Sequence, residues 1–147
     1  MIGSETSLWQ WLWKSWKTVP RSMLDVNRVE NSAGTGMPDV EGFYKTDQFW
    51  LELKVAERPK SKLTEIDVKH LRPKQVQWLH NRWLVGGNAW ILLRVESTTS
   101  KSSSAYLIPG KYSRQVKAGL TEQELSGISY VPPGADQMEI LLVAIGR

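Results

Sequence analysis

Two carboxylates and a lysine lie close together in a stretch of the sequence that is otherwise mostly apolar. Asp39 stands near the start of the stretch 37–55, and Glu52 and Lys54 stand near its end. The segments on either side of the polar run at 45–48 are rich in aromatic and β-branched residues, and this pattern predicts a β-hairpin. A hairpin this short would bring Asp39 close to Glu52 across its two strands.

Two carboxylates that meet in this way repel each other unless they share a proton or hold a divalent cation. Side chains alternate across a strand, so Glu52 and Lys54 are expected on one face, with Leu51 and Leu53 on the other. The charge of Lys54 would then be available for a phosphate or a metal-bound hydroxide. A solvated edge strand with scattered charges is the alternative interpretation.

The same residues resemble the core motif of the PD-(D/E)xK nucleases, in which a Pro-Asp pair is followed by Glu-x-Lys. The run that leads into the Pro-Asp pair, R-V-x-N-S-x-G-x-G-x-P-D, is similar to the VRR-NUC and archaeal-type Holliday junction resolvase branches, as is a downstream Gln-x-x-Trp-Leu. The resemblance covers roughly residues 4–95. The matching positions are Arg28, Val29, Asn31, Ser32, Gly34, Gly36, Pro38, Asp39, Glu52, Lys54, Gln75, Trp78 and Leu79.

This resemblance implies a metal-dependent DNA endonuclease that hydrolyses phosphodiester bonds and is structure-selective, like the Holliday junction resolvases of DNA recombination and repair. It implies that Asp39 and Glu52 ligate Mg²⁺ or Mn²⁺, with the backbone carbonyl of Leu53 as a third ligand. Lys54 would orient or deprotonate the attacking water or stabilise the transition state, and Gln75 would help to place the nucleophile. Oxygen ligands of this kind suit Mg²⁺ or Mn²⁺ rather than zinc.

The family also carries a glutamate near the start of its first helix, and that glutamate faces the metal. The sequence predicts a helix over 4–17, with Glu5 on the same stripe as its apolar side chains. Glu5 is therefore the first candidate for an accessory carboxylate, and Glu30, just before the Asn-Ser pair, is the second. For Glu5 the alternative is a carboxylate that favours the helix dipole and turns to solvent.

Two further regions are expected to contact DNA. The loop 30–36 combines glycines with small polar residues, so its amides and hydroxyls can approach a phosphate closely, although a plain linker is the alternative. The segment 56–70 and the start of the next helix carry lysines beside the predicted site, where solvation is the default role. The predicted DNA-binding residues are Asn31, Ser32, Gly34, Lys60, Lys62 and Lys74.

The order of elements predicts an α/β fold with a restriction-endonuclease-like core, in which helices flank a mixed central β-sheet. One domain over 1–147 is expected, with a core at about 4–95 and a strand, helix and strand appended over 96–147. After the first helix, the predicted elements are strands at 23–29, 40–44 and 49–55, a helix at 73–85, strands at 89–95 and 106–108, a weak helix at 112–125 and a strand at 138–145.

The composition is typical of an intracellular globular protein. The chain has 147 residues, a mass of 16.8 kDa and no cysteine, which excludes a disulfide framework and a thiolate zinc site. No apolar run approaches the roughly 20 residues needed to cross a membrane, and no secretory signal pattern is present. These features predict the cytoplasm or nucleoid of a prokaryotic or virus-infected cell. The net charge of +4 supports a polyanionic partner only weakly.

DNA, branched or duplex, is the predicted partner, together with a second copy of the chain. Symmetric cleavage of a four-way junction needs two active sites, which a two-fold dimer supplies. Trp11 and the apolar C-terminal strand are candidates for its interface. Three alternatives stay open: a restriction- or repair-type nuclease without junction preference, a DNA-binding module that does not cut, and a protein-interaction unit that docks through its tryptophan-rich first helix.

Overall fold

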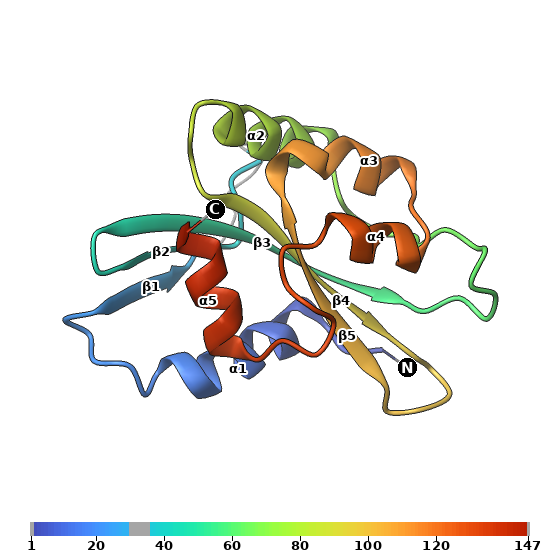
Figure 1. Ribbon diagram of the computed structural model, residues 1–147, viewed down its shortest axis with the longest axis horizontal. Coiled ribbons are helices and arrows are strands. Elements are labelled where there is room, and N and C mark those ends of the chain that lie inside the picture. Colours follow the sequence, from blue (N-terminus) through green and yellow to red (C-terminus); the bar gives the residue numbers. More distant parts are fainter. Residues whose placement is uncertain (1, 30–35, 147) are drawn as a thin grey trace.

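The computed structural model describes residues 2–29 and 36–146 (Figure 1). A helix precedes three strands, and a second helix leads into two more strands and a helical C-terminal part. The elements are α1 (Glu5–Trp16), β1 (Leu24–Arg28), β2 (Val40–Tyr44), β3 (Asp47–Glu57), α2 (Pro73–Leu84), β4 (Ala89–Glu96), β5 (Ser103–Pro109), the 3₁₀ turn η1 (Gly110–Tyr112), α3 (Ser113–Ala118), α4 (Glu122–Ile128) and α5 (Gln137–Gly146).

The strands form one mixed sheet in the order β1-β2-β3-β4-β5. The first three strands are an antiparallel meander, β3 and β4 are parallel, and β4 and β5 are antiparallel. Parallel neighbours need a crossover connection, and α2 provides it between β3 and β4. The prediction of an α/β fold with a mixed central sheet flanked by helices is confirmed, and the architecture is consistent with a restriction-endonuclease-like core.

Helices cover both faces of this sheet (Figure 1). α1 and α5 lie on one face, where Leu12 and Ile140 share a core with Leu53 of β3. α2, α3 and α4 lie on the other face, where Leu79 of α2 packs in a second core with Leu93 of β4. The strand β3 is therefore enclosed on both sides, and polar side chains in its middle are removed from solvent.

The predicted hairpin forms between β2 and β3. Its register pairs Val40 with Leu51 and Tyr44 with Asp47, so the connection consists of Lys45 and Thr46 alone. Lys45 adopts the left-handed conformation, with φ of 55°, as tight hairpin turns require. β3 extends beyond the N-terminal end of β2. Among the described residues, its part after Leu51 is therefore paired with β4 alone.

Local capping signals fix the ends of the two longer helices. The hydroxyl of Ser4 accepts the N–H of Ser7 at 3.1 Å, and the Ser7 hydroxyl accepts the N–H of Ser4 at 3.0 Å, which forms a capping box before α1. Pro73 occupies the first turn of α2, and Gly86, with φ of 96°, follows its end. α1 and α2 have 12 residues each. Across residues 2–29 and 36–146, none of the helices is both long and apolar enough to cross a membrane.

The C-terminal run 138–145 is a helix, and the predicted strand is wrong. Asp136 Oδ1 accepts the N–H of Glu139 at 2.8 Å and thereby caps the first turn of α5. An unbroken apolar run does not distinguish a buried strand from a buried helix, and here the Asp-x-x-Glu start signal decides for the helix. The appended segment 96–147 is therefore a strand followed by helices. The buried residues of α5 are Ile140, Leu141 and Ala144.

Both features predicted for a dimer interface also make contacts within the protomer. Trp11 is half-buried and packs against the core under α1. Its carbonyl accepts a hydrogen bond from Gln137 Nε2 at 3.0 Å, which links α1 to α5. The C-terminal segment packs as a helix on the sheet and offers no sheet edge to a second copy.

Candidate active site

The strand β3 and the residue before β2 carry the predicted catalytic side chains. Glu52 and Lys54 project from β3 to the face covered by α2, and they are only 1% and 4% exposed. Asp39 is half-buried and immediately precedes β2. The hairpin therefore brings Asp39, Glu52 and Lys54 together, as the sequence predicts.

Asp39 lies where the pairing between β2 and β3 ends. The last pair in the ladder is Val40 with Leu51, and two residues further along β3 the N–H of Leu53 donates to Asp39 Oδ2 at 2.9 Å. The N–H and C=O of one strand residue point to the same side of the strand. The Leu53 carbonyl therefore also faces the side on which Asp39 lies.

Glu52 is a buried carboxyl group with an unsatisfied oxygen. Its Oε2 accepts a hydrogen bond from Gln75 Nε2 at 3.3 Å, whereas its buried Oε1 has no hydrogen-bond partner among the described residues. Burial raises the pKa of Glu52 to about 9, and a side-chain hydrogen bond with Asp39 and the charge of that carboxylate act in the same direction. Without a cation, Glu52 therefore holds a proton at neutral pH.

Lys54 is also fixed by the fold. Its Nζ donates to the backbone carbonyl of His70 at 3.0 Å and lies 3.6 Å from Glu52 Oε2. The Lys54 ammonium lowers the pKa of Glu52, but by less than burial and Asp39 raise it. His70 has φ of 64°, a left-handed conformation that is uncommon for a residue with a side chain. The connection before α2 thus holds a strained backbone whose carbonyl orients Lys54.

Gln75 orients Glu52 from the first turn of α2. It is 7% exposed, its Oε1 accepts the N–H of Arg72 at 2.9 Å, and its Nε2 donates to Glu52. Both ends of the amide are therefore used in holding the start of the helix against the carboxylate.

The donor set fits a hard divalent cation. Mg²⁺ is commonly bound by one or two carboxylates, with water and substrate phosphate completing its shell. Asp39, Glu52 with its unpartnered Oε1, and the Leu53 carbonyl supply oxygen donors of this type. In the parts of the chain that the structure describes, no three His, Cys, Asp or Glu residues form a metal-binding group. Glu5 thus does not complete a three-carboxylate group, and Glu30 lies outside the described residues.

The first turn of α1 lies near the site without joining it. Arg28 Nη2, at the end of β1, donates to the hydroxyl of Thr6 at 3.2 Å, and Arg28 is paired with Val40, the neighbour of Asp39. The half-buried Glu5 belongs to this turn. Its role as an accessory ligand remains a prediction.

The predicted DNA-binding residues fall into three groups. Asn31, Ser32 and Gly34 lie outside the described residues. Lys74 is exposed on the first turn of α2, where Gly36, with φ of 75°, packs so closely that a Cβ would collide with the Lys74 carbonyl. The end of the glycine-rich loop therefore lies beside this turn. Lys60 and Lys62 are exposed at a separate cavity.

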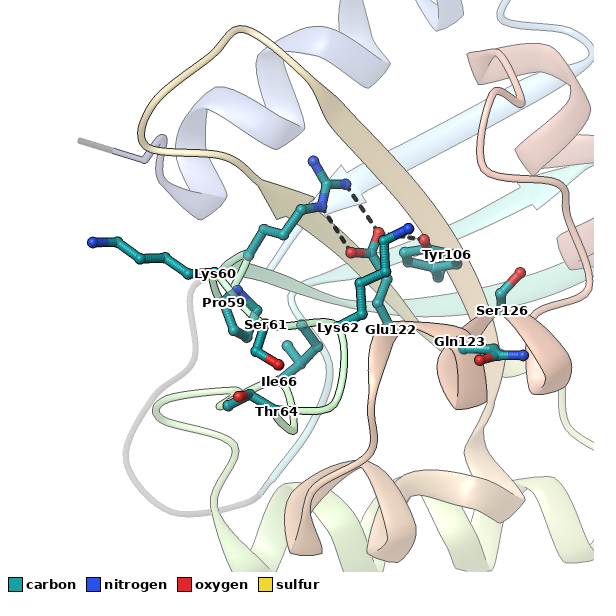
Figure 2. Close-up of a pocket in the computed structure, with 11 residues that line it drawn as sticks. Pro59, Lys60, Ser61, Lys62, Thr64, Ile66, Tyr106, Glu122, Gln123 and Ser126 are labelled. Carbon is teal, nitrogen blue, oxygen red and sulfur yellow. Dashed lines mark hydrogen bonds and ion pairs between the residues drawn. The ribbon is translucent and has the colours of Figure 1, made fainter.

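That cavity has a volume of about 440 Å³ and lies beyond the C-terminal end of β3 (Figure 2). Arg58 forms an ion pair with Glu122 of α4, through its Nε at 2.7 Å and its Nη2 at 2.9 Å. Its remaining N–H groups donate to Ser102 and Ser104, and Tyr106 donates to Glu122 at 2.6 Å. All the donors of Arg58 are therefore used within the fold, and this residue ties β3 to β5 and α4.

The ion pair also explains the titration of the cavity wall. Hydrogen bonds from Arg58 hold the pKa of Glu122 below its ordinary value. Burial, and then the bond to Glu122, raises the pKa of Tyr106 to about 12. These groups keep one charge state over the physiological range, which is the behaviour of a structural network.

The sequence reading missed two contacts near the site. One is the backbone carbonyl of His70, for which the sequence carries no signal. The other is the arginine Arg82, which lies over the rings of Trp50 and Trp78. The sequence does place Trp78 and Arg82 on the same helix face as Gln75. It also places Trp50 on the same face of its strand as Glu52, because side chains two residues apart on a strand point to the same side.

Comparison with protein families gives no matching family model, and no protein of curated function is significantly similar in sequence. The chemistry of the site therefore rests on the positions and contacts of Asp39, Glu52, Lys54 and Gln75.

Proposed function

We propose that this chain is a divalent-metal-dependent endonuclease that hydrolyses phosphodiester bonds in DNA. The observation that carries the proposal is the burial of the Glu52 carboxyl group beside Asp39, with the buried ammonium of Lys54 3.6 Å from Glu52 Oε2. Two carboxyl groups this close share a proton or hold a divalent cation. In this proposal a cation replaces the proton that Glu52 holds in the metal-free protein.

The residues have distinct roles in this proposal. Asp39, Glu52 and the Leu53 carbonyl would hold Mg²⁺ or Mn²⁺, which supplies positive charge for the scissile phosphate and lowers the pKa of a bound water. The Lys54 ammonium, held by His70, would donate to the attacking water or to a phosphate oxygen that gains negative charge. Gln75 keeps the Glu52 carboxylate in one orientation, so that little reorganisation is needed when the cation binds.

Branched DNA is the proposed substrate, because the sequence resembles the structure-selective branches of the PD-(D/E)xK nucleases. Lys74 is exposed on the first turn of α2, and Lys60 and Lys62 are exposed on the connection between β3 and α2. These side chains would hold phosphates on either side of the scissile bond through a salt-dependent attraction.

A cleavage panel tests the proposal. Four-way junctions, flaps, nicked duplex, intact duplex and single strands are incubated with the protein and Mg²⁺ or Mn²⁺, with EDTA as the control. Cleavage that needs the cation and favours a branched substrate supports the proposal. Equal cleavage of intact duplex would favour a restriction- or repair-type nuclease instead. Tight binding with no cleavage of any substrate would contradict the proposal and favour a DNA-binding module.

A further inference from the structure

Arg82 is held between two tryptophans at the end of the active-site face. Its guanidinium carbon lies 4.8 Å from the ring centroid of Trp50 and 4.4 Å from that of Trp78. The two rings meet edge to face, with their centroids 5.7 Å apart and an interplanar angle of 67°. A guanidinium over two indole rings gains cation–π attraction from both and loses rotational freedom.

Gly87 closes a further side of this position. A Cβ on Gly87 would lie 2.7 Å from both Cγ and Cδ of Arg82, and 2.9 Å from its carbonyl oxygen. The close approach of the stem of Arg82 to the chain therefore depends on the missing side chain at 87. Two indole rings and a glycine thus fix where the guanidinium lies.

The charge of Arg82 is not neutralised within the fold. Within residues 2–29 and 36–146, no carboxylate lies within ion-pair distance of its guanidinium, and no hydrogen bond from it is formed. It borders an open hollow of about 620 Å³ between the β2–β3 turn and the chain after α2, with Asp47 on the rim. Its N–H donors are therefore available to a ligand, and a planar fork of donors matches the oxygens of a phosphate.

The hollow continues the line of the candidate active site. Trp50 is two residues before Glu52 on the same face of β3, which corresponds to about 6.6 Å along a strand. On α2, Gln75 contacts Glu52 while Trp78 contacts Trp50, so the two elements run in opposite directions beside each other. Gln75 and Arg82 are seven residues apart on this helix, or about 10 Å.

We propose that Arg82, clamped by Trp50, Trp78 and Gly87, binds a backbone phosphate of the DNA. Each nucleotide of a duplex strand advances about 3.4 Å along the axis, so this phosphate lies two to three nucleotides from the scissile one. A rigid contact at a fixed distance sets the position of the strand over Asp39 and Glu52. The proposal rests on the proposed nuclease function and adds a second anchor for the same substrate.

The test measures binding in EDTA, so that it does not depend on cleavage. Fluorescence anisotropy with a labelled nicked duplex is followed across a salt series for the parent protein, Arg82→Gln and Arg82→Lys. Loss of one phosphate contact should lower the slope of log K against log salt by about 0.9 for Arg82→Gln. Lys101→Gln is the matched control, because it removes one charge from the β4–β5 loop, at the other end of the sheet.

A phosphate scan identifies the contact on the DNA side. Single phosphates near the nick are replaced by neutral methylphosphonates, and binding by the parent protein and Arg82→Gln is compared at each position. At one position the loss seen with the parent should disappear in Arg82→Gln, because the two changes remove the same contact. Losses that add at every position would overturn the proposal, as would an unchanged salt slope or no DNA binding.

Gly87→Ala checks that the clamp matters as well as the charge. The added Cβ should displace Arg82 and weaken binding several-fold, with loss of discrimination at the same methylphosphonate position. Gly127→Ala is the control, because a Cβ there meets open space. If Gly87→Ala binds like the parent, the clamp plays no part in binding. A protein that cleaves DNA but shows no coupled position would retain the proposed function and lose this inference.

Discussion

Glu52 is a carboxylic acid that the fold buries beside a second carboxyl group, and this one residue links the stability of the protein to its proposed activity. Its Oε2 accepts from Gln75, and its carboxyl group is hydrogen-bonded to Asp39. Burial and the neighbouring Asp39 raise its pKa to about 9. Such strain is typical of sites that a ligand completes.

The raised pKa predicts how the stability of the metal-free protein depends on pH. Because the folded pKa of about 9 exceeds the ordinary value of 4.5, the native state binds more protons than the unfolded state between these values. The free energy of unfolding should therefore fall as the pH rises through this range. Thermal unfolding in EDTA across the range measures it.

Glu52→Gln is the variant that checks this assignment, because it keeps the shape and removes the titration. Its unfolding temperature should vary less with pH than that of the parent. Addition of Mg²⁺ should stabilise the parent most at the upper end of the range, where the cation does not compete with a proton. An identical pH dependence in the parent and Glu52→Gln would show that another group is responsible.

Cleavage is expected to require all three central side chains. Asp39→Asn and Glu52→Gln each remove a metal ligand, and Lys54→Met removes the buried ammonium. Each change should reduce single-turnover cleavage by about a thousandfold or more, or ~4 kcal/mol of transition-state stabilisation. The controls are Asp25→Asn on β1 and Lys101→Met, which change exposed residues away from the site. Cleavage by Lys54→Met at the parental rate would remove Lys54 from the mechanism.

At the scale of single elements, the C-terminal helix α5 forms part of the floor beneath the site. It packs on the face of the sheet that also receives Leu51 and Leu53, the neighbours of Glu52 on β3. Trp90 Nε1 donates to the carbonyl of Ala144 at 2.9 Å, which connects α5 to the central strand β4. The helix therefore supports β3 from the side opposite to the carboxylates.

A helix and a strand over this segment predict different patterns of destabilisation. In α5, the adjacent residues Ile140 and Leu141 are both buried, whereas Leu142 is 51% exposed. Ile140→Ala and Leu141→Ala should each lower the free energy of unfolding by about 2–5 kcal/mol, and Leu142→Ala should change it little. Urea unfolding measures all three. A large loss for Leu142→Ala would contradict the helix.

The connection between β3 and α2 carries the lysines that are expected to attract DNA. Lys60 and Lys62 are exposed on the rim of the cavity in Figure 2, and neither forms an ion pair within the described residues. Charge reversal of both to Glu should weaken DNA binding and flatten its salt dependence, without changing the cleavage rate at saturation. Arg21→Glu, in the turn before β1, is the control. If the doubly substituted protein binds DNA like the parent and like Arg21→Glu, the lysines do not contact DNA.

At the scale of the whole molecule, the two layers of helices cover opposite faces of the sheet, and only one of these faces carries the candidate site (Figure 1). α1 and α5 cover one face with a core that includes Trp16 and Phe49. The other face holds α2 and the buried polar side chains Glu52, Lys54 and Gln75. The candidate site thus lies on a central strand that is packed on both faces.

The number of copies that act together is testable at this scale. Paired cleavage of a four-way junction requires two sites, so we expect a particle of about twice 16.8 kDa on junction DNA. Light scattering with and without junction measures the protein mass. A monomeric particle on the junction would shift the substrate to nicks, flaps or duplex.

The sequence by itself predicted the hairpin, the helices α1 and α2, and the meeting of Asp39 with Glu52. These features depend on local signals: alternation along a strand, serine and proline at helix starts, and glycine after α2. A short hairpin fixes which residues face each other, so the proximity of the two carboxylates follows from spacing alone.

Only the tertiary structure decided the features that depend on distant partners. Lys54 donates a hydrogen bond to the backbone carbonyl of His70, a residue in the left-handed conformation. Arg58 forms an ion pair with Glu122, which lies 64 residues further along the chain. Likewise, the apolar run of α5 suits a strand or a helix equally well, because burial satisfies both. Its start at Asp136 is a local signal, and the packing of Ile140, Leu141 and Ala144 in the core with residues of α1 is the tertiary contribution. Local propensity limits what a segment can form, and packing against the rest of the chain selects among those forms.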